Sequence, residues 1–319
     1  MTDRMRILVA GAGLFGREHL RLLAARDDVA IVGVADAVAA SAEAAAARFG
    51  AGACDTDTIA LFDRTRPDGL VVATPGETHV RLATHALRAG VPVLVEKPVG
   101  IDAAEARRLA EEEAASRAFV LPGHVLRFSP SHRLLADIAL GGGIGRVLSV
   151  TSRRHRDDSH ARRYPEMDPI LMTMIHDIDL AVWLSGGGIA EGFAIRAPAG
   201  PRSVTTFTAR GAGGAAWYLT TAWTLPGACP ADRVEVVCEN GGVELEVGSF
   251  LRRYGATEER IDIGGEAWDD SLREEQSAFI EAIRSGRRPT AVTVADAITG
   301  LVAAEAAMAS IASGGLVRA

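Results

Sequence analysis

Cysteine, aromatic residues and excess positive charge are all scarce in this sequence. Its 319 residues include three cysteines, 5% aromatic residues, and 34 lysines and arginines against 41 aspartates and glutamates, a formal net charge of −7. Cys54, Cys229 and Cys238 form no CxxC pair and no disulfide framework, which is typical of a protein of the reducing cytoplasm. Proteins whose main partner is a nucleic acid usually have a basic face, so we expect no nucleic-acid partner.

Long apolar runs are also missing. Charged residues or glycines interrupt the apolar segments well before the roughly 18 residues that a membrane-spanning helix needs, so we expect no membrane partner. The first residues lead into a strand-like segment without the layout of a signal peptide. With 48% hydrophobic and 24% charged residues, the chain has the composition of a globular protein, and its length favours two domains.

Short β-branched runs alternate with alanine-rich stretches in the first third of the chain. We expect strands at residues 6–10, 30–36, 69–74 and 91–96, and helices at 14–25, 39–49 and 77–89. Continuous apolar strands separated by helices predict an α/β domain, a doubly wound parallel sheet covered on both faces.

The pattern changes after about residue 122. Longer strand-like segments follow one another there, and Asn240-Gly241 between two alternating runs predicts an antiparallel hairpin. We expect helices at about 169–184, 272–284 and 294–313. The predicted division is a doubly wound domain in residues 1–122 and an α+β domain in residues 123–319.

A glycine-rich turn follows the first strand and opens the first helix. It fits the pattern GxGxxG, and Asp36 stands 20 residues after its last glycine, at the end of the second strand. The glycines permit close approach to a pyrophosphate at the helix N-terminus, and Asp36 can accept hydrogen bonds from the adenosine ribose. The motif alone is weak, but this context predicts a dinucleotide-binding Rossmann domain. The predicted cofactor-binding residues of the turn are Gly11, Gly13, Leu14, Phe15 and Gly16.

Asp36 also predicts which dinucleotide is bound. Its charge repels a 2′-phosphate, and the residues that follow, Ala37-Val38-Ala39, offer no arginine to neutralise one. The nearest downstream arginine is Arg48. We therefore expect NAD to be preferred over NADP.

Further signatures lie outside the glycine turn. They are Thr74-Pro75 with His79, Glu96-Lys97-Pro98, Gly123-His124 with Arg127-Phe128 and Pro130, His176-Asp177-Ile178-Asp179, and the stretch from Leu272 to Gly286 with Pro289. With these motifs the chain resembles the glucose–fructose oxidoreductase / inositol dehydrogenase (Gfo/Idh/MocA) family over nearly its whole length. Glu96-Lys97-Pro98 ends a predicted parallel strand, where ligands of such sheets bind.

The resemblance implies a Rossmann domain followed by a domain with an open, mainly antiparallel sheet. It also implies a dehydrogenase that acts on a secondary alcohol of a sugar, cyclitol or other polyol, and a homodimer or homotetramer. In the family, the equivalent of Lys97 is catalytic and orients the substrate, and the equivalent of His176 lies beside the reacting hydroxyl. The further predicted cofactor-binding residues are Thr74, Pro75, His79, Glu96 and Lys97.

The chemistry of alcohol oxidation suits both predicted catalytic residues. The hydroxyl proton must leave as the hydride is transferred, and a histidine such as His176 can take it near neutral pH. Lys97 can stabilise the developing alkoxide, or act as the base if nearby positive charge lowers its pKa. The simpler alternatives are a solvated loop lysine and a histidine satisfied within a packed helix.

One position departs from the family pattern. Many members carry an aspartate four residues before the histidine, where this chain has Met172, and a thioether cannot relay a proton. Asp179, three residues after His176 on the same helix face, could orient the imidazole instead, and Asp168 could approach from the preceding loop. Only Lys97 and His176 are therefore predicted to be catalytic.

A polar segment from Arg153 to Tyr164 follows a strand of the second domain. It is either a solvated, mixed-charge loop or part of a site for an anionic or hydroxyl-rich substrate, because arginine suits carboxylates. The flanking arginines argue against a metal at His155, Asp157 and His160, and we predict none. The candidate substrate residues are His124, Arg127, His155, Tyr164, Met172 and Asp179.

The sequence thus predicts a cytoplasmic NAD-dependent dehydrogenase acting on the CH–OH group of a small polyol or sugar, whose identity it does not specify. An NAD-dependent glycosidase, which oxidises its substrate transiently and returns the hydride, fits the same scaffold. So does a non-catalytic NAD-sensing regulator, although a pure sensor has no chemical use for Lys97.

Overall fold

The protein consists of two compact units. The computed structural model describes residues 4–200, 202–265 and 268–318. Unit 1 comprises Met1–Val125 and Ser271–Ala297, and unit 2 comprises Leu126–Asp270 and Ile298–Ala319. Residues 1–3, the beginning of the segment predicted to lead into the first strand, lie outside the described residues.

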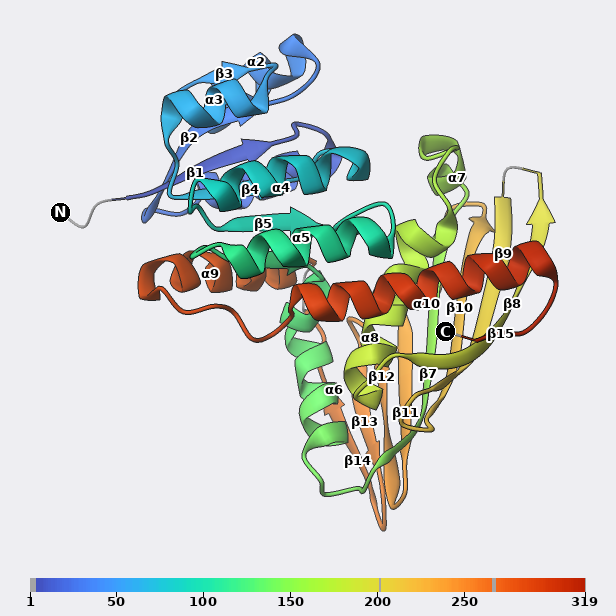
Figure 1. The fold of residues 1–319 in the computed structure, drawn as a ribbon. Helices are drawn as coiled ribbons and strands as arrows, with labels where there is room; N and C mark the ends of the chain where they lie inside the picture. The colour runs from blue at the N-terminus through green and yellow to red at the C-terminus, as the bar shows by residue number, and fades with distance from the viewer. Residues whose placement is uncertain (1–3, 201, 266–267, 319) are drawn as a thin grey trace. The chain divides into compact units, whose positions relative to one another are not determined.

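Unit 1 contains a six-stranded parallel sheet with the order β3-β2-β1-β4-β5-β6 (Figure 1). The order 3-2-1-4-5-6 is that of a doubly wound, dinucleotide-binding fold, so the predicted fold class is confirmed. Apart from the short, half-buried β3, the strands are mainly buried apolar runs, as a sheet covered on both faces requires. Their bounds are β1 Met5–Ala10, β2 Val29–Ala35, β3 Cys54–Asp55, β4 Gly69–Val72, β5 Val93–Glu96 and β6 Val120–Gly123.

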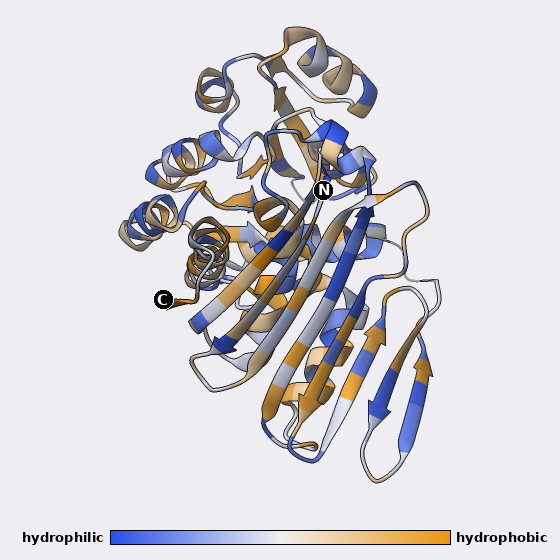
Figure 2. Cartoon of the chain, turned by 90° about the vertical axis from the view of Figure 1, so that its right-hand side faces the viewer, coloured by the Kyte–Doolittle hydropathy of each residue, from blue (hydrophilic) through white to orange (hydrophobic). Residues whose placement is uncertain are grey.

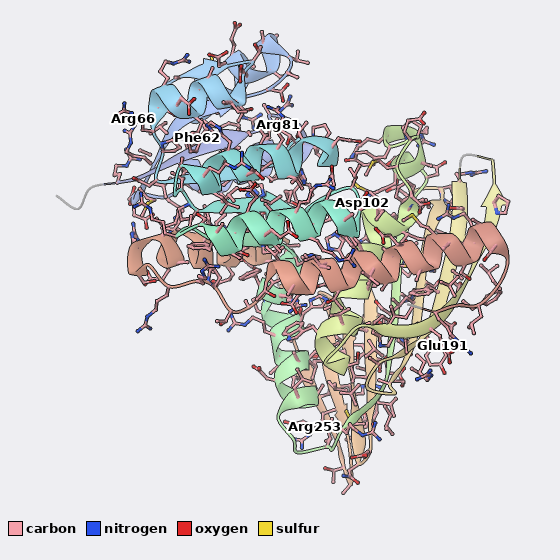
Figure 3. All side chains as sticks on the ribbon, viewed as in Figure 1. Phe62, Arg66, Arg81, Asp102, Glu191 and Arg253 are labelled. Atoms are coloured by element: carbon pink, nitrogen blue, oxygen red, sulfur yellow. The ribbon has the colours of Figure 1, made fainter. Side chains whose placement is uncertain are left out.

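Helices connect these strands. In Figure 1, α3, α4 and α5 lie in front of the sheet. Asp57 caps α3 by accepting the backbone N–H groups of Ile59 and Ala60. Phe62, labelled on α3 in Figure 3, packs edge-on against His85 of α4, with the ring centres 5.2 Å apart. The helices are α1 Leu14–Ala24, α2 Ala39–Phe49, α3 Thr58–Thr65, α4 His79–Arg88 and α5 Ala103–Ala115, with a 3₁₀ turn, η1 Gly76–Thr78.

A late segment of the chain also belongs to unit 1. Helix α9 (Trp268–Ser285) places Phe279 6.1 Å from Phe119, edge to face, and Phe279 and Ile283 fill the space beside Gly69. The predicted boundary at residue 122 assigned this segment to the second domain. The structure differs because the apolar face of α9 packs against residues of unit 1, and the first break falls after Val125.

Unit 2 is built on a nine-stranded sheet with the order β14-β13-β12-β11-β7-β10-β9-β8-β15. All neighbours are antiparallel except β7 and β10, so the predicted mainly antiparallel sheet is confirmed. The predicted hairpin at Asn240-Gly241 joins β11 to β12, with Cys238 opposite Gly241. The strands are β7 Val147–Asp157, β8 Ile189–Ala199, β9 Arg202–Gly211, β10 Ala216–Leu225, β11 Arg233–Cys238, β12 Gly241–Glu246, β13 Phe250–Tyr254, β14 Glu258–Asp262 and β15 Val317–Arg318.

Buried and exposed residues alternate along the central strands of this sheet. Figure 2 shows the corresponding hydrophobic and hydrophilic bands. This alternation is typical of an antiparallel sheet with one packed face and one solvated face. Helix α8 packs against β7 and β10, and α6 packs against β12. The helical segments are η2 Val125–Phe128, α6 Pro130–Leu140, α7 Ser159–Arg163, η3 Ile170–Met174, α8 Ile175–Ser185 and α10 Val294–Ser313.

Helix α10 is the longest and most apolar helix that the structure describes. By length and composition alone it could cross a membrane. Its most apolar 18 residues have a mean hydropathy of 1.5, and half of them are buried inside the protein. The core helix of a soluble protein meets the same criteria, so the feature is weak evidence for a membrane span. Asp296, Gly300 and Glu305 interrupt the apolar residues of α10, as expected from the sequence, and the alanines between them keep its mean hydropathy high.

Candidate active site

The glycine turn leaves no room for side chains at two of its positions. Gly11 has a φ of +99°, and a Cβ there would lie 2.3 Å from the carbonyl oxygen of Ala73. A Cβ on Gly16 would lie 1.9 Å from the carbonyl oxygen of Gly11. Gly13, by contrast, faces open space at the N-terminus of α1. The turn therefore brings bare backbone to a helix N-terminus, which is the arrangement that binds a pyrophosphate.

Asp36 is fixed beside this turn. Its Oδ2 accepts the backbone N–H of Ala12 at 2.7 Å, and its Oδ1 accepts the N–H of Val38 at 2.9 Å. Each carboxylate oxygen has a second lone pair, which leaves acceptor capacity for ribose hydroxyls. Leu14 is exposed and Phe15 half-buried in the same turn. The residues predicted for the adenosine end of the cofactor are thus brought together.

His79 links the loops that follow β4 and β5. It is buried, and its Nδ1 and Nε2 lie 2.8 Å and 2.7 Å from the carbonyl oxygens of Pro98 and Thr74. The Thr74 hydroxyl lies 2.6 Å from that of Thr78. His79 therefore braces the loop that carries Thr74 and Pro75, and its predicted contact with cofactor stays a prediction.

Lys97 stands at the carboxyl end of β5, half-buried, directly after the buried Glu96. Glu96 Oε1 lies 2.9 Å from His19 Nε2, and its Oε2 accepts the Lys97 backbone N–H at 3.2 Å. Burial raises the pKa of Glu96, but the hydrogen bond from His19 and nearby positive charge outweigh it and hold this pKa below its usual value. Glu96 points into unit 1, a placement that the motif alone does not indicate. Lys97 is also the only lysine in the sequence.

His176 is the second residue of α8 and is half-buried. The turn before it, η3, is a π-helix, a rare form that is frequent at functional sites. This turn carries Met172, which is half-buried, and Met174, which is fully buried. The predicted helix is confirmed, but the π-helical turn was not foreseen.

Both acidic residues that follow His176 are buried and paired with arginines. Arg127 donates to both oxygens of Asp179 at 2.8–3.1 Å, and its guanidinium lies 5.5 Å from the centre of the Trp183 ring. The structure thus joins two predicted substrate residues to each other. The predicted role of Asp179 in orienting the imidazole of His176 stays a prediction.

Asp177 belongs to a second buried network. It accepts hydrogen bonds from Ser152 Oγ at 2.6 Å and from Arg154 Nε at 3.1 Å, while Arg154 also pairs with Asp232. Burial raises the pKa of Asp177, and the charge of Arg154 offsets this only in part. Burial and the same charge lower the pKa of His132 to about 3. The basic segment around residue 154 is therefore partly core rather than a solvated loop.

The remaining substrate candidates lie on several elements. Burial and the charge of Arg153 lower the pKa of the half-buried His155, on β7. Tyr164 follows α7, with its ring 6.2 Å from that of His160. His124 is buried after β6, and Asp168 pairs with Arg196 of β8 at 2.6–2.9 Å.

Sequence reasoning missed a connection to the turn that precedes His176. The His160 ring lies 5.8 Å from the Trp223 ring, and Trp223 Nε1 donates to Thr173 Oγ1 at 2.9 Å. The only local signal for it is Trp223 itself, the aromatic residue near the end of β10. Trp223 therefore ties the π-helical turn to β10 and α7.

The fold and the glycine turn define the class of protein, an NAD-binding oxidoreductase of Rossmann type. Residues 5–124 match the family model described as the oxidoreductase family, NAD-binding Rossmann fold, and residues 132–244 match the GFO/IDH/MocA C-terminal domain. The chain belongs to the Gfo/Idh/MocA family, which confirms the resemblance found from the motifs.

Similar proteins cover nearly the whole chain. Inositol 2-dehydrogenase 4 of Saccharopolyspora erythraea is 31% identical over 98% of this chain and 94% of its own length. The structure of myo-inositol 2-dehydrogenase from Lactobacillus plantarum superposes with a TM-score of 0.87 at 22% identity, covering 99% of both chains, which shows the fold. GenD2 from gentamicin A biosynthesis, solved in complex with NAD, superposes with a TM-score of 0.84 at 25% identity, covering 100% of this chain and 97% of its own.

Proposed function

We propose that this protein oxidises a secondary alcohol of a cyclitol or related polyol with NAD. The observation that carries the proposal is the position of Lys97. It stands at the carboxyl end of a parallel strand, where ligands of such sheets bind, in a chain similar over its whole length to an inositol 2-dehydrogenase. Every other cationic side chain, histidine aside, is an arginine, so the one lysine coincides with the position predicted for chemistry.

The residues of unit 1 fit the dinucleotide. The crowding at Gly11 and Gly16 keeps the turn free of side chains, and Asp36 lies against the turn through Ala12. When bound, NAD supplies the hydride acceptor. We propose that Asp36 makes NAD preferred over NADP, because its carboxylate repels a 2′-phosphate.

Two side chains divide the work on the alcohol. His176 removes the hydroxyl proton, and the Lys97 ammonium stabilises the alkoxide oxygen as the C–H bond breaks. Losing either interaction costs about 10²-fold or more in turnover, the usual scale for such groups. Met172 stands where many family members have an aspartate, so the substrate hydroxyl that this aspartate would bind must be held otherwise.

We also propose that the chain forms a homo-oligomer in the cytoplasm. Phe193 and Ile195 of β8, Tyr218 of β10 and Val237 of β11 are large apolar residues between 38% and 58% exposed on unit 2. We propose that these side chains form part of the contact between copies, because exposed apolar patches mark such interfaces. Light scattering of wild type and Ile195→Glu tests the assembly, which the glutamate should weaken.

The proposed location in the cytoplasm is supported by the three cysteines. All three are free, which suits a reducing compartment.

A substrate panel tests the proposed function. Inositols, other cyclitols, sugars and sugar acids are each incubated with NAD, and absorbance is followed at 340 nm. We expect sustained NADH formation with at least one cyclitol or polyol. Cleavage of a glycoside without net NADH would favour the glycosidase, and NAD binding without turnover of any compound would favour the sensor.

A further inference from the structure

A buried group of titratable residues lies behind Lys97 in unit 1. His19 of α1, Glu96 of β5 and Glu275 of α9 each offer a nitrogen or carboxylate oxygen, and these atoms lie within 4.8 Å of one another. His19 and Glu275 are fully buried, and Glu96 is 6% exposed. Only Glu96 was singled out from the sequence, and the proposed reaction leaves all three unexplained.

The His19 ring has both nitrogens engaged. Gln276 Nε2 lies 3.1 Å from His19 Nδ1 and 3.2 Å from the His19 carbonyl oxygen. That carbonyl accepts only, so the amide NH₂ faces His19 and donates to Nδ1. Nε2 then carries the proton that it donates to Glu96 at 2.9 Å. With neither nitrogen free, His19 is a poor metal ligand here.

Glu275 differs from its neighbours. Among the described residues, neither of its carboxylate oxygens has a hydrogen-bond partner. The titratable groups that face it are His19 from α1 and Glu96 from β5, and none of the arginines or lysines that the structure describes forms an ion pair with it. A buried carboxylate without a cation or donor costs far more free energy than the uncharged carboxylic acid at the same place. Burial and the charge of Glu96 accordingly raise the pKa of Glu275 well above its usual value.

We propose that Glu275 acts as an uncharged carboxylic acid that keeps the single negative charge of this cluster on Glu96, and that this charge holds Lys97 as an ammonium. Glu275 is then a positioning residue, acting on Lys97 through Glu96. A carboxyl oxygen of Glu275 lies within 4.8 Å of one of Glu96, close enough for their charges to interact strongly. The inference rests on the proposed role of Lys97, and it assigns that lysine to alkoxide stabilisation rather than to proton removal.

The electrostatic link between Glu96 and Lys97 is reciprocal. The charge of Lys97 is one cause that lowers the pKa of Glu96, so the Glu96 carboxylate must stabilise the Lys97 ammonium in turn. A second charge on Glu275 would oppose ionisation of Glu96 at short range. An uncharged Glu275 avoids this repulsion between two carboxylates, and its O–H can serve as a hydrogen-bond donor within the group of His19, Glu96 and Glu275.

The single lysine makes a direct measurement possible. Protein labelled with [ε-¹³C]lysine gives one lysine resonance, that of Lys97, whose chemical shift reports its titration in the intact protein. We expect Glu96→Gln to lower the titration midpoint by about one pH unit. Glu275→Gln, which replaces an uncharged acid by an uncharged amide, should leave the midpoint within about 0.3 units. Glu274→Gln, at an exposed position next in the helix, is the matched control and should change nothing.

Stability against pH gives a second, independent readout. A raised pKa in the folded state means that the folded protein binds more protons than the unfolded one between pH 4.5 and that pKa, so stability falls as pH rises. Glu275→Gln removes this slope. We expect the melting temperature of Glu275→Gln, relative to that of wild type, to rise by about 3 °C for each pH unit in that range.

Defined results overturn the proposal. If Glu275→Gln lowers the Lys97 midpoint as much as Glu96→Gln does, Glu275 is charged. If Glu96→Gln folds, as judged by NAD binding, and does not move the midpoint, the cluster does not support Lys97. A rise in melting temperature of wild type, but not of Glu275→Gln, with added Zn²⁺ would make the cluster a metal site. None of these measurements needs a substrate, so a failed substrate panel would sink the proposed function without deciding this one.

Discussion

Asp36 binds the glycine turn itself: its Oδ2 accepts the backbone N–H of Ala12 at 2.7 Å. The residue that we propose discriminates between dinucleotides therefore also anchors the turn that is predicted to receive the pyrophosphate. Its second oxygen holds the N–H of Val38. Removing the side chain should thus have two effects, one on charge and one on loop geometry, and different substitutions can separate them.

We expect wild type to bind NAD more tightly than NADP. Asp36→Asn keeps an oxygen that can accept from Ala12 but removes the charge, so the preference should shift toward NADP by about tenfold or more. Asp36→Ala should weaken both cofactors, because the turn loses its anchor. Calorimetric titration of each protein with each cofactor measures this. Equal or tighter NADP binding by wild type would contradict the account.

Lys97→Ala should leave NAD affinity nearly unchanged, since the glycine turn and Asp36 hold the far end of the cofactor. Turnover should fall about 10²-fold or more, because the alkoxide loses its cation. Lys97→Arg keeps the charge but not the compact ammonium, and should recover only part of the rate. Steady-state kinetics on the identified substrate, with calorimetry for NAD, checks both. A near-normal rate for Lys97→Ala would remove this residue from the mechanism.

If His176 takes the proton, the rate of alcohol oxidation should fall as pH drops through about 6–7, where histidines ordinarily titrate. His176→Asn should abolish this acid limb along with most of the activity. Asp179→Asn should reduce activity less. The measurement is the pH–rate profile of the three proteins. Identical acid limbs and similar rates in wild type and His176→Asn would make His176 a packing residue.

Met172→Asp restores the aspartate that many family members have. We expect it to lower turnover on the native substrate, because a carboxylate at a half-buried position loses solvation. Met172→Leu, similar in volume and apolar, should change the rate much less and serves as the control. Comparing kcat and KM for the three proteins checks this. A faster Met172→Asp enzyme would mean that the chain lacks only the proton relay.

The buried His132 predicts acid sensitivity of unit 2. Its pKa is lowered to about 3 by burial and by the charge of Arg154. The unfolded state binds more protons between about pH 6.5 and 3, so stability falls as pH drops through this range, by up to about 5 kcal/mol. His132→Gln should flatten this loss, whereas His85→Gln on α4 should not. Denaturant unfolding at pH 4 to 7 measures it, and parallel losses in wild type and His132→Gln would refute the assignment.

Local pattern was enough to predict the parallel sheet and its cofactor turn. The apolar runs and the glycine turn are each set by neighbouring residues, and Asp36 follows the turn at the expected spacing of 20 residues, so the spacing carries the geometry. The hairpin at Asn240-Gly241 was predictable for the same reason. The short helix α3 lay in a stretch that the alternation left unassigned, although Asp57 offered a capping signal.

Long-range pairing was not predictable. Arg127 and Asp179 stand 52 residues apart, and nothing local shows that each neutralises the other in the core. The same holds for Arg154 with Asp177, which turns part of a basic segment inward. Helix α9 was assigned by its place in the chain, whereas Phe279 and Ile283 need the apolar surface of unit 1. The role of Glu275 depends on three elements meeting, which no single motif encodes.

Deuterium transfer tests the central claim most directly. A polyol from the substrate panel, deuterated at its carbinol carbons, is oxidised with unlabelled NAD, and the nicotinamide product is analysed by mass spectrometry. Direct hydride transfer predicts one deuterium in each NADH formed, with Lys97→Ala forming the same labelled product about 10²-fold more slowly. Unlabelled NADH, or a cleaved product that retains all of its deuterium while NAD is unchanged, would contradict the assignment of this chain as a polyol dehydrogenase.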